Sequence, residues 1–178
     1  DVLDLCLSCK ACKTECPSSV DMAKIKTEYL AHYLEEHGVP LRTRIFANIH
    51  ASSLLASKMP KLANLAMKSP MAKFAMRKIG IAAEREMSPF AEETFEAWWK
   101  KHVARRDAKQ ATGQQYTRGP VVYFHDTFAN FNYPRVGRAT VRLLEAAGYE
   151  VIVETRRACC GRPMLSKGLV EQARGLAR

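Results

Sequence analysis

Four cysteines near the N-terminus constrain this chain most, because their spacing suits an iron–sulfur cluster. Cys6, Cys9, Cys12 and Cys16 stand before Pro17 in the pattern C-x₂-C-x₂-C-x₃-C-P. This is a bacterial spacing for a [4Fe–4S] cluster. Its two-residue gaps wrap the backbone in tight turns, so that three thiolates reach one cube from the same side. We therefore predict that these four cysteines are metal ligands and that a [4Fe–4S] cluster is the cofactor.

The last cysteine of this run indicates a second cluster. In two-cluster proteins with this spacing, the fourth cysteine ligates the other cluster. We expect Cys6, Cys9 and Cys12 to bind the local cluster and Cys16 to bind its neighbour, whose main motif would precede Asp1; the alternative is that Cys16 is spare. The chain lacks an initiator Met and is expected to be a fragment of a longer polypeptide. Zinc is the alternative, although it usually takes paired C-x₂-C units across a longer loop, often with His.

A second group of candidate site residues follows two predicted strands. His125 and Asp126 come directly after the first strand, and Cys159 and Cys160 come after the second. In a parallel sheet both stretches emerge at the carboxyl edge, where open α/β folds bind ligands. We predict a second site there, with the N-terminus of a helix from Ser166 nearby to favour anions. Alternatively, the cysteines are small buried hydrophobes and the histidine is a capping or surface residue.

The chain divides into a helical first part and a later part with strands. Proline and glycine break the helical region, and after residue 119 short β-branched runs alternate with helical patterns. Strand–helix–strand–helix of these lengths predicts a parallel βαβ unit. The predicted elements are helices at 21–37, 92–102, 134–147 and 166–178, further helices within 41–102 broken at Pro60, Pro70, Gly80 and Pro89, and strands at 121–124 and 150–155.

Apolar residues at helical spacing predict which side chains are buried. The expected inward faces are Ile25, Tyr29 and Tyr33 with Leu30 and Leu34 in the first helix, then Leu54, Leu55, Met59, Leu62, Leu65, Ala66, Met67, Phe74 and Ile79 in the middle region, then Val136, Val141, Leu143 and Leu144 in the helix after the first strand.

About half of the net charge of +10 lies in one stretch, from Lys100 to Arg118. Residues 103–118 are polar and basic and predict a solvated linker, or alternatively a docking strip for an acidic partner or an anionic membrane surface. A nucleic-acid partner is not expected, because no aromatic residues interleave with these charges. No uncharged apolar run approaches the roughly 18–20 residues of a membrane span. The cations of the stretch are Lys100, Lys101, Arg105, Arg106, Lys109 and Arg118.

Together the motifs at 6–29, 125–151 and 159–169 resemble a known family. The chain is similar to the iron–sulfur and Cys-Cys-Gly region of fused FAD-linked oxidases of the D-lactate and D-2-hydroxyglutarate dehydrogenase type. It also resembles the iron–sulfur subunits of glycolate oxidase, anaerobic glycerol-3-phosphate dehydrogenase and heterodisulfide reductase. In that family the loop after the first strand usually carries a Cys, whereas this chain has His125 and Asp126 there.

The resemblance implies a fold of the α+β class. It implies half of an α-helical [4Fe–4S] ferredoxin domain at 1–40, a helical region at 41–102, a basic linker at 103–118 and a partial Cys-Cys-Gly α/β (βαβα) domain at 119–178. It also implies a cytoplasmic protein, including a peripheral place at the inner face of the membrane. The clustering of the six cysteines agrees with this, because a disulfide scaffold would spread them along the chain.

The function implied by the resemblance is electron transfer within a FAD-linked 2-hydroxy-acid oxidoreductase. Electrons would pass from FAD, in an upstream domain or a partner flavoprotein subunit, through [4Fe–4S] clusters to an acceptor such as a quinone. None of the residues of this chain is expected to be catalytic. Two alternatives are a non-catalytic redox-sensing or scaffold module, and a thiol–disulfide reductase that uses Cys159 and Cys160.

Overall fold

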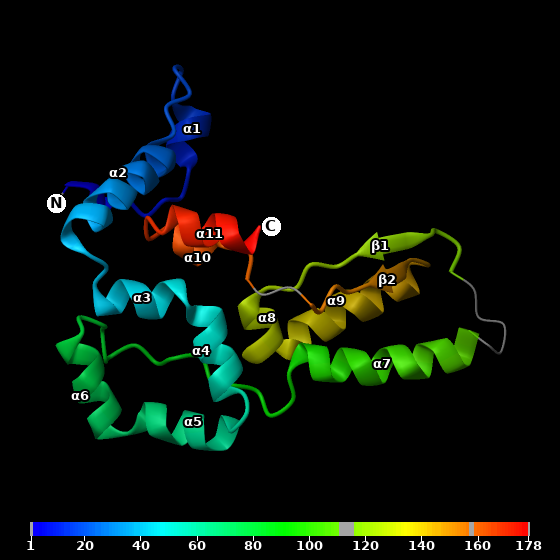
Figure 1. Ribbon diagram of the computed structural model, residues 1–178. Helices are drawn as coiled ribbons and strands as arrows, with labels where there is room; N and C mark the ends of the chain where they lie inside the picture. The colour runs from blue at the N-terminus through cyan, green and yellow to red at the C-terminus, as the bar shows by residue number, and fades with distance from the viewer. Residues whose placement is uncertain (1, 111–115, 157–158, 178) are drawn as a thin grey trace. The chain divides into compact units, whose positions relative to one another are not determined.

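The computed structural model describes residues 2–110, 116–156 and 159–177. Most of these residues are helical, and they include a small parallel sheet of two strands, which confirms the predicted α+β class. The elements, shown in Figure 1, are the 3₁₀ helix η1 (Val2–Leu5), α1 (Ala11–Glu15), α2 (Met22–His37), α3 (Leu41–Ala47), α4 (Ile49–Ala56), α5 (Pro60–Lys68), α6 (Pro70–Lys78), α7 (Phe95–Gln110), β1 (Pro120–Val122), α8 (Thr127–Phe131), α9 (Pro134–Ala146), β2 (Glu150–Ile152), α10 (Arg162–Leu165) and α11 (Val170–Leu176).

The chain forms two compact units. The first unit combines Asp1–Ile49 with Cys159–Arg178, and the second unit is His50–Ala158. The first unit therefore contains all six cysteines, and the second contains the sheet. The four domains predicted from the sequence, at 1–40, 41–102, 103–118 and 119–178, stay a prediction.

Helix α2 organises the first unit. It begins where the Asp21 side chain accepts a hydrogen bond from the Lys24 backbone N–H at 3.0 Å, which satisfies an otherwise unpaired amide of the first turn. It ends at Gly38, whose φ of +78° suits a residue without Cβ. The observed bounds confirm the predicted helix at 21–37.

The core of the first unit joins segments from both ends of the chain. Its buried side chains come from α2, α3, α10 and α11, and the close packing of the C-terminal segment on α2 leaves no space for a Cβ at Gly168, which would lie 2.6 Å from the Leu30 Cβ. The buried members of this core are Leu34, Ala47, Met164, Leu169 and Ala173.

The predicted apolar face of α2 is partly wrong. Ile25, Tyr29 and Tyr33 are exposed, whereas Ala23 and Leu34 are buried. The reason is that the C-terminal segment packs on the side of α2 that carries Leu30 and Leu34, where Gly168 allows the two backbones to approach closely. The sequence alone did not indicate which of the two apolar sides would meet this partner.

The second unit is built on the predicted βαβ arrangement. Strands β1 and β2 pair in parallel, with Val121 opposite Val151. Helix α9 lies on the connection between them and packs against both β2 and α7 (Figure 1). Phe95 at the start of α7 is fully buried and presses on Gly137 of α9, where an added Cβ would lie 2.6 Å from the Phe95 ring. The fully or nearly buried core residues are Phe95, Trp99, Val141 and Val151.

Several predicted boundaries and faces in this region need correction. Helix α7 continues to Gln110, beyond the predicted end at His102, because its later residues still pack on the sheet. Val136 and Leu143 of α9 are exposed, although Val141 is buried as predicted. Ser166 ends α10 instead of beginning the last helix, so the helix N-terminus predicted there is wrong.

Helices α4, α5 and α6 show the largest difference from the predicted core. Pro60 and Pro70 interrupt the helical region as predicted, since each occupies a first turn, where its missing N–H costs no hydrogen bond. Most of the large apolar side chains predicted to be inside lie on the surface instead. The exposed residues of the predicted core are Leu54, Leu55, Met59, Leu62, Leu65, Ala66 and Phe74.

Candidate functional site

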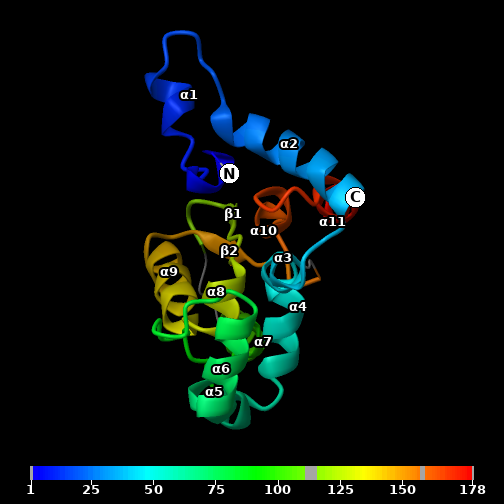
Figure 2. The same ribbon diagram turned by 90° about the vertical axis from the view of Figure 1, so that its left-hand side faces the viewer.

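The cysteine motif forms an irregular loop at the start of the first unit. Cys6 follows η1, Cys12 lies in α1, and Cys16 directly follows α1. Figure 2 shows the extended loop that joins α1 to α2. Cys9 is exposed, and the other three cysteines are half-buried. All four have free thiols.

Two residues inside the motif have left-handed backbone conformations. Ser8 has a φ of 54° and Lys10 a φ of 66°, although residues with a Cβ adopt this region only at a cost. Such strain persists where the surrounding structure needs it, often at ligand sites. Alternating right- and left-handed residues turn successive backbone N–H groups toward one concave side, an arrangement that suits anions and iron–sulfur clusters.

The last thiol of the motif is surrounded by backbone amides. The N–H group of Val20, followed by those of Ser18 and Ser19, lowers the pKa of the Cys16 thiol below its ordinary value. Ser19 also has a left-handed φ of 53°, which helps this short stretch curl around the sulfur. Hydrogen bonds to the charged form favour the thiolate, which is the form that binds metals.

Helix α2 holds the loop from the other side. The ammonium group of Lys26 donates a hydrogen bond of 2.8 Å to the carbonyl of Cys6. Lys13 lies 4.0 Å from Asp21, the residue that caps α2. The beginning and the end of the motif are therefore both attached to the first turns of α2.

The donor set fits an iron–sulfur cluster in its chemistry and local backbone. Four thiols lie within eleven residues, and Ser8 and Lys10 between them have the left-handed conformation described above. Within residues 2–110, 116–156 and 159–177, no three His, Cys, Asp or Glu side chains are arranged to hold a single metal ion. Thiolate ligation of a cluster through Cys6, Cys9, Cys12 and Cys16 remains a prediction.

The candidate residues of the second site belong to different compact units. Cys159 is half-buried and Cys160 is exposed, and both belong to the first unit. They precede Gly161, whose φ of +76° turns the chain into α10. His125 and Asp126 belong to the second unit. A common site made of both groups remains a prediction.

His125 forms a buried pair with a carboxylate of α7. Its side chain is 2 % exposed, and its Nε2 lies 2.9 Å from Oε1 of Glu96. An ionised carboxylate only accepts hydrogen bonds, so Nε2 carries the proton. Asn130 donates to the same oxygen at 3.0 Å. Nδ1 of His125 is buried without a hydrogen-bond partner in the described part of the chain.

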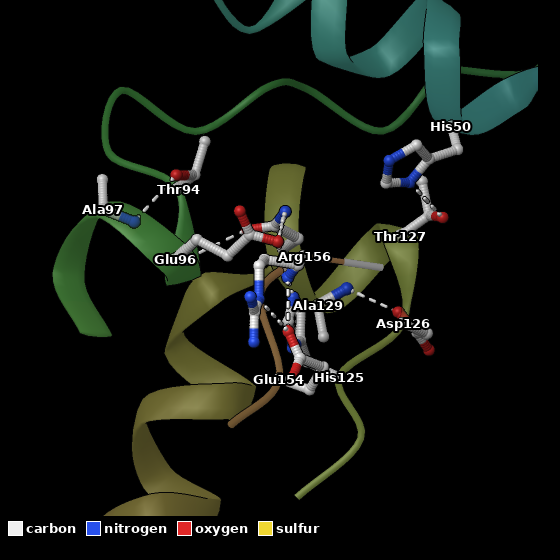
Figure 3. Close-up of polar contacts among 11 residues, drawn as sticks. His50, Thr94, Glu96, Ala97, His125, Asp126, Thr127, Ala129, Glu154 and Arg156 are labelled. Atoms are coloured by element: carbon white, nitrogen blue, oxygen red, sulfur yellow. Dashed lines mark hydrogen bonds and ion pairs between the residues drawn. The ribbon is translucent and has the colours of Figure 1, made fainter. Parts of the chain in front are cut away.

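Asp126 has a structural role at the start of α8. Its carboxylate accepts a hydrogen bond from the Ala129 backbone N–H at 2.6 Å, as an N-terminal cap. In Figure 3 the neighbouring Thr127 points toward His50 of α4, whose Nδ1 lies 3.3 Å from the threonine Oγ1. The capping residue of this loop is thus Asp126, whereas His125 is neither a cap nor on the surface.

The partners of His125 have no signature in the sequence. Glu96 stands 29 residues earlier and Asn130 lies in a helix that was not predicted. A second pair was also missed, in which His102 lies 2.8 Å from the Glu145 carboxylate.

The basic stretch is largely held by the chain itself. Lys101 pairs with Glu93 at 2.7 Å, and Arg106 donates to the Val151 carbonyl at 2.7 Å. Arg118 lies over the Tyr149 ring, 5.7 Å from its centre. These contacts reduce the number of cations that the predicted docking strip can offer to another molecule.

The fold and the two cysteine motifs define a cysteine-rich α+β protein. Its α/β part matches a known family: residues 121–178 match the CCG family, described as the cysteine-rich domain. The predicted resemblance is therefore confirmed at the level of this domain and of the relatives that follow.

Curated relatives cover most of the chain at low identity. D-2-hydroxyglutarate dehydrogenase of Pantoea ananatis is 25 % identical over 152 residues, 83 % of this chain and 15 % of that protein. One subunit of the anaerobic glycerol-3-phosphate dehydrogenase of Escherichia coli is 29 % identical over 90 residues, 51 % of this chain and 21 % of that protein. The probable glycolate oxidase iron-sulfur subunit of Bacillus subtilis is 26 % identical over 168 residues, 89 % of this chain and 37 % of that protein.

The chain thus spans well under half the length of these relatives. No solved structure matches it. None of the helices in the described part of the chain has the length and apolar character needed to cross a bilayer.

Proposed function

We propose that this chain is the iron–sulfur electron-transfer segment of a FAD-linked 2-hydroxy-acid oxidoreductase. The observation that carries the proposal is the cysteine loop, whose left-handed residues and amide-ringed Cys16 suit a cluster of negative charge. The relatives support it, since one is named as an iron-sulfur subunit and others as dehydrogenases of D-2-hydroxyglutarate or glycerol-3-phosphate.

Each thiol has a proposed place. Cys6, Cys9 and Cys12 hold the local [4Fe–4S] cluster, and Cys16 serves a neighbouring cluster. A cluster of this kind accepts and releases one electron at a time. The chain positions the thiolates, lowers the proton affinity of Cys16 through backbone N–H groups, and attaches the loop to α2 through Lys26.

The proposal includes partners outside this chain. A flavoprotein domain or subunit holds FAD and performs the substrate chemistry, and an acceptor such as a quinone receives the electrons. The protein is proposed to be cytoplasmic, with a peripheral place at the inner face of the membrane. Cys159, Cys160, His125 and Asp126 stay proposed as residues of a second site.

The decisive experiment compares full-length protein, purified anaerobically, with its Cys9→Ser variant. We expect the variant to lose the iron and sulfide of the local cluster and the corresponding EPR signal after reduction. Flavin reduction by the substrate should persist, while reduction of an external acceptor is lost. Thr14→Ala is the matched control, because this exposed side chain bonds only to the Ala11 carbonyl within α1.

Unchanged iron content in Cys9→Ser would contradict the ligand assignment. Stoichiometric zinc in the wild-type protein would contradict the electron-transfer role. A panel of lactate, 2-hydroxyglutarate, glycolate and glycerol-3-phosphate then identifies the donor by the rate of flavin bleaching. If none of them reduces a flavin in the full-length protein, the assignment to hydroxy-acid oxidation fails.

A further inference from the structure

The middle of the chain has an unusual distribution of charge. From residue 37 to residue 83 the sequence contains no Asp or Glu. The same stretch carries eight cations, so its surface is positive along several helices. These cations are Arg42, Arg44, Lys58, Lys61, Lys68, Lys73, Arg77 and Lys78.

Large apolar side chains lie on the surface among the later of these cations. Met71 is 80 % exposed, Leu65 70 % and Phe74 63 %. Single exposed apolar residues are common on proteins, but a contiguous set usually marks an interaction surface. The α4–α6 face is defined here by Leu54, Leu55, Met59, Leu62, Leu65, Met71 and Phe74.

Specific hydrogen bonds hold α5 with this side outward. The Asn64 amide donates to the Phe90 carbonyl at 2.9 Å and accepts from the Phe90 N–H at 2.8 Å. This reciprocal pair fixes the inner side of α5. Leu62 and Leu65 are exposed away from this pair, and the exposed Lys61 and Lys68 lie on the flank between Asn64 and Leu65 at helical spacing.

Helix α6 repeats the arrangement of an apolar centre with flanking cations. The Lys78 ammonium lies 5.6 Å from the centre of the exposed Phe74 ring. Arg77 pairs with Glu84 at 2.9 Å, and Lys73 is exposed on the flank. Helices α5 and α6 contact each other at the corner that Ser69 and Pro70 form (Figures 1 and 2).

We propose that the α4–α6 face binds the surface of an anionic lipid bilayer. Helices that lie in a membrane interface carry Lys and Arg on the polar side and Leu or Phe on the other. Protein–protein interfaces are instead depleted of Lys. A bilayer of acidic lipids supplies both negative charge for these cations and an apolar layer for the exposed side chains.

This inference rests on the peripheral membrane association included in the proposed function and names the surface that makes it. The apolar side chains of α5 and α6 enter the boundary between headgroups and acyl chains, and Lys68 and Lys73 contact the headgroups. The attraction is partly electrostatic, so it weakens as salt screens the lysines.

The test is co-sedimentation of the full-length protein with vesicles of phosphatidylcholine, alone or mixed with phosphatidylglycerol. We expect binding to the anionic vesicles only, weakened by added salt. The double variant Leu62→Ser, Leu65→Ser should bind at least about tenfold more weakly. Leu143→Ser is the matched control, because Leu143 is 72 % exposed on α9, and it should bind like the wild type.

A second pair of variants separates charge from apolar contact. Lys68→Gln with Lys73→Gln should weaken binding, whereas Lys100→Gln with Arg105→Gln, which removes the same charge from α7, should not. Equal binding to neutral vesicles, or wild-type affinity in the Leu62, Leu65 variant, would overturn the proposal. The proposal would also be overturned if the wild-type protein bound no vesicles and formed a dimer that the Leu62→Ser, Leu65→Ser substitutions abolish. Cluster reduction by the flavin is measured separately, so failure here leaves electron transfer untouched.

Discussion

The cysteine loop and the core around Phe95 hold their side chains by opposite means. In the loop, Cys9 is exposed and the other thiols are half-buried, and the shape comes from local backbone conformations and amides. In the second unit, Phe95 and His125 are almost fully buried and are held by residues distant in sequence.

This difference indicates which region depends on a bound ligand for its order. A loop with little burial and strained residues gains much of its order from the ligand, as metal sites often do. A packed core keeps its structure without help from a ligand. Substitutions in the core should therefore change unfolding, whereas substitutions in the loop should change cluster retention.

The largest expected effect is the loss of Phe95. Phe95→Ala should lower the free energy of unfolding of the second unit by about 3–5 kcal/mol, because it leaves a cavity against Gly137 and Trp99. Denaturant unfolding followed by tryptophan fluorescence measures this, since the only two Trp residues of the chain, Trp98 and Trp99, lie in this unit.

The matched control is Phe74→Ala on the exposed α4–α6 face. Phe74 is 63 % exposed, so its removal should change the unfolding free energy by no more than about 0.5 kcal/mol. If both substitutions cost the same, either Phe95 is not the centre of the core or Phe74 is buried in solution. Equal costs would therefore contradict the conclusion that burial around Phe95 stabilises the second unit.

The next largest effect concerns the His125–Glu96 pair. Glu96→Ala leaves two buried donors, on His125 and Asn130, without their acceptor, which should cost about 1–3 kcal/mol of stability. A double-mutant cycle with His125→Ala should give a coupling energy of about 0.5–3 kcal/mol. Additive losses in the cycle would show that the two side chains do not interact.

A smaller effect tests the strained loop. Lys10→Ala and Lys10→Gly both remove the charge, but only glycine adopts a φ of 66° freely. The alanine variant should hold the cluster less tightly by about 1 kcal/mol, or roughly fivefold faster loss of iron to a chelator. Equal rates of loss would mean that the left-handed conformation does not persist in the loaded protein.

Local patterns predicted the parts of the fold that local physics determines. The proline positions and the parallel pairing of the two strands were correct, because ring geometry and β-branching act within a few residues. The predicted face of α2 was wrong in part and that of α4–α6 for most of its residues, because an apolar stripe does not say whether its partner is in the same chain.

The candidate sites divide along the same line. The four candidate cysteine ligands could be identified from the sequence, since they lie close together in it. The buried partner of His125 could not be predicted, because Glu96 reaches it only after α7 packs beside the sheet. Long-range contacts of this kind depend on packing that no short pattern encodes.

The smallest expected effect concerns the ion pairs of Glu93 on the surface of the second unit. The hydrogen bond from Lys101, with the charge of Arg138, lowers the pKa of Glu93 below its ordinary value of 4.5. The carboxylate therefore stabilises the folded unit above that ordinary value, and its contribution disappears as the pH falls through the lowered pKa. Glu93→Gln should cost less than about 1 kcal/mol at pH 7, because Glu93 is partly exposed and solvent screens it. Unfolding curves of variant and wild type should converge at a pH below the lowered pKa. A large loss of unfolding free energy, or one that persists in acid, would mean that Glu93 stabilises the core by packing. The stability of the second unit would then depend less on Phe95 than its burial indicates.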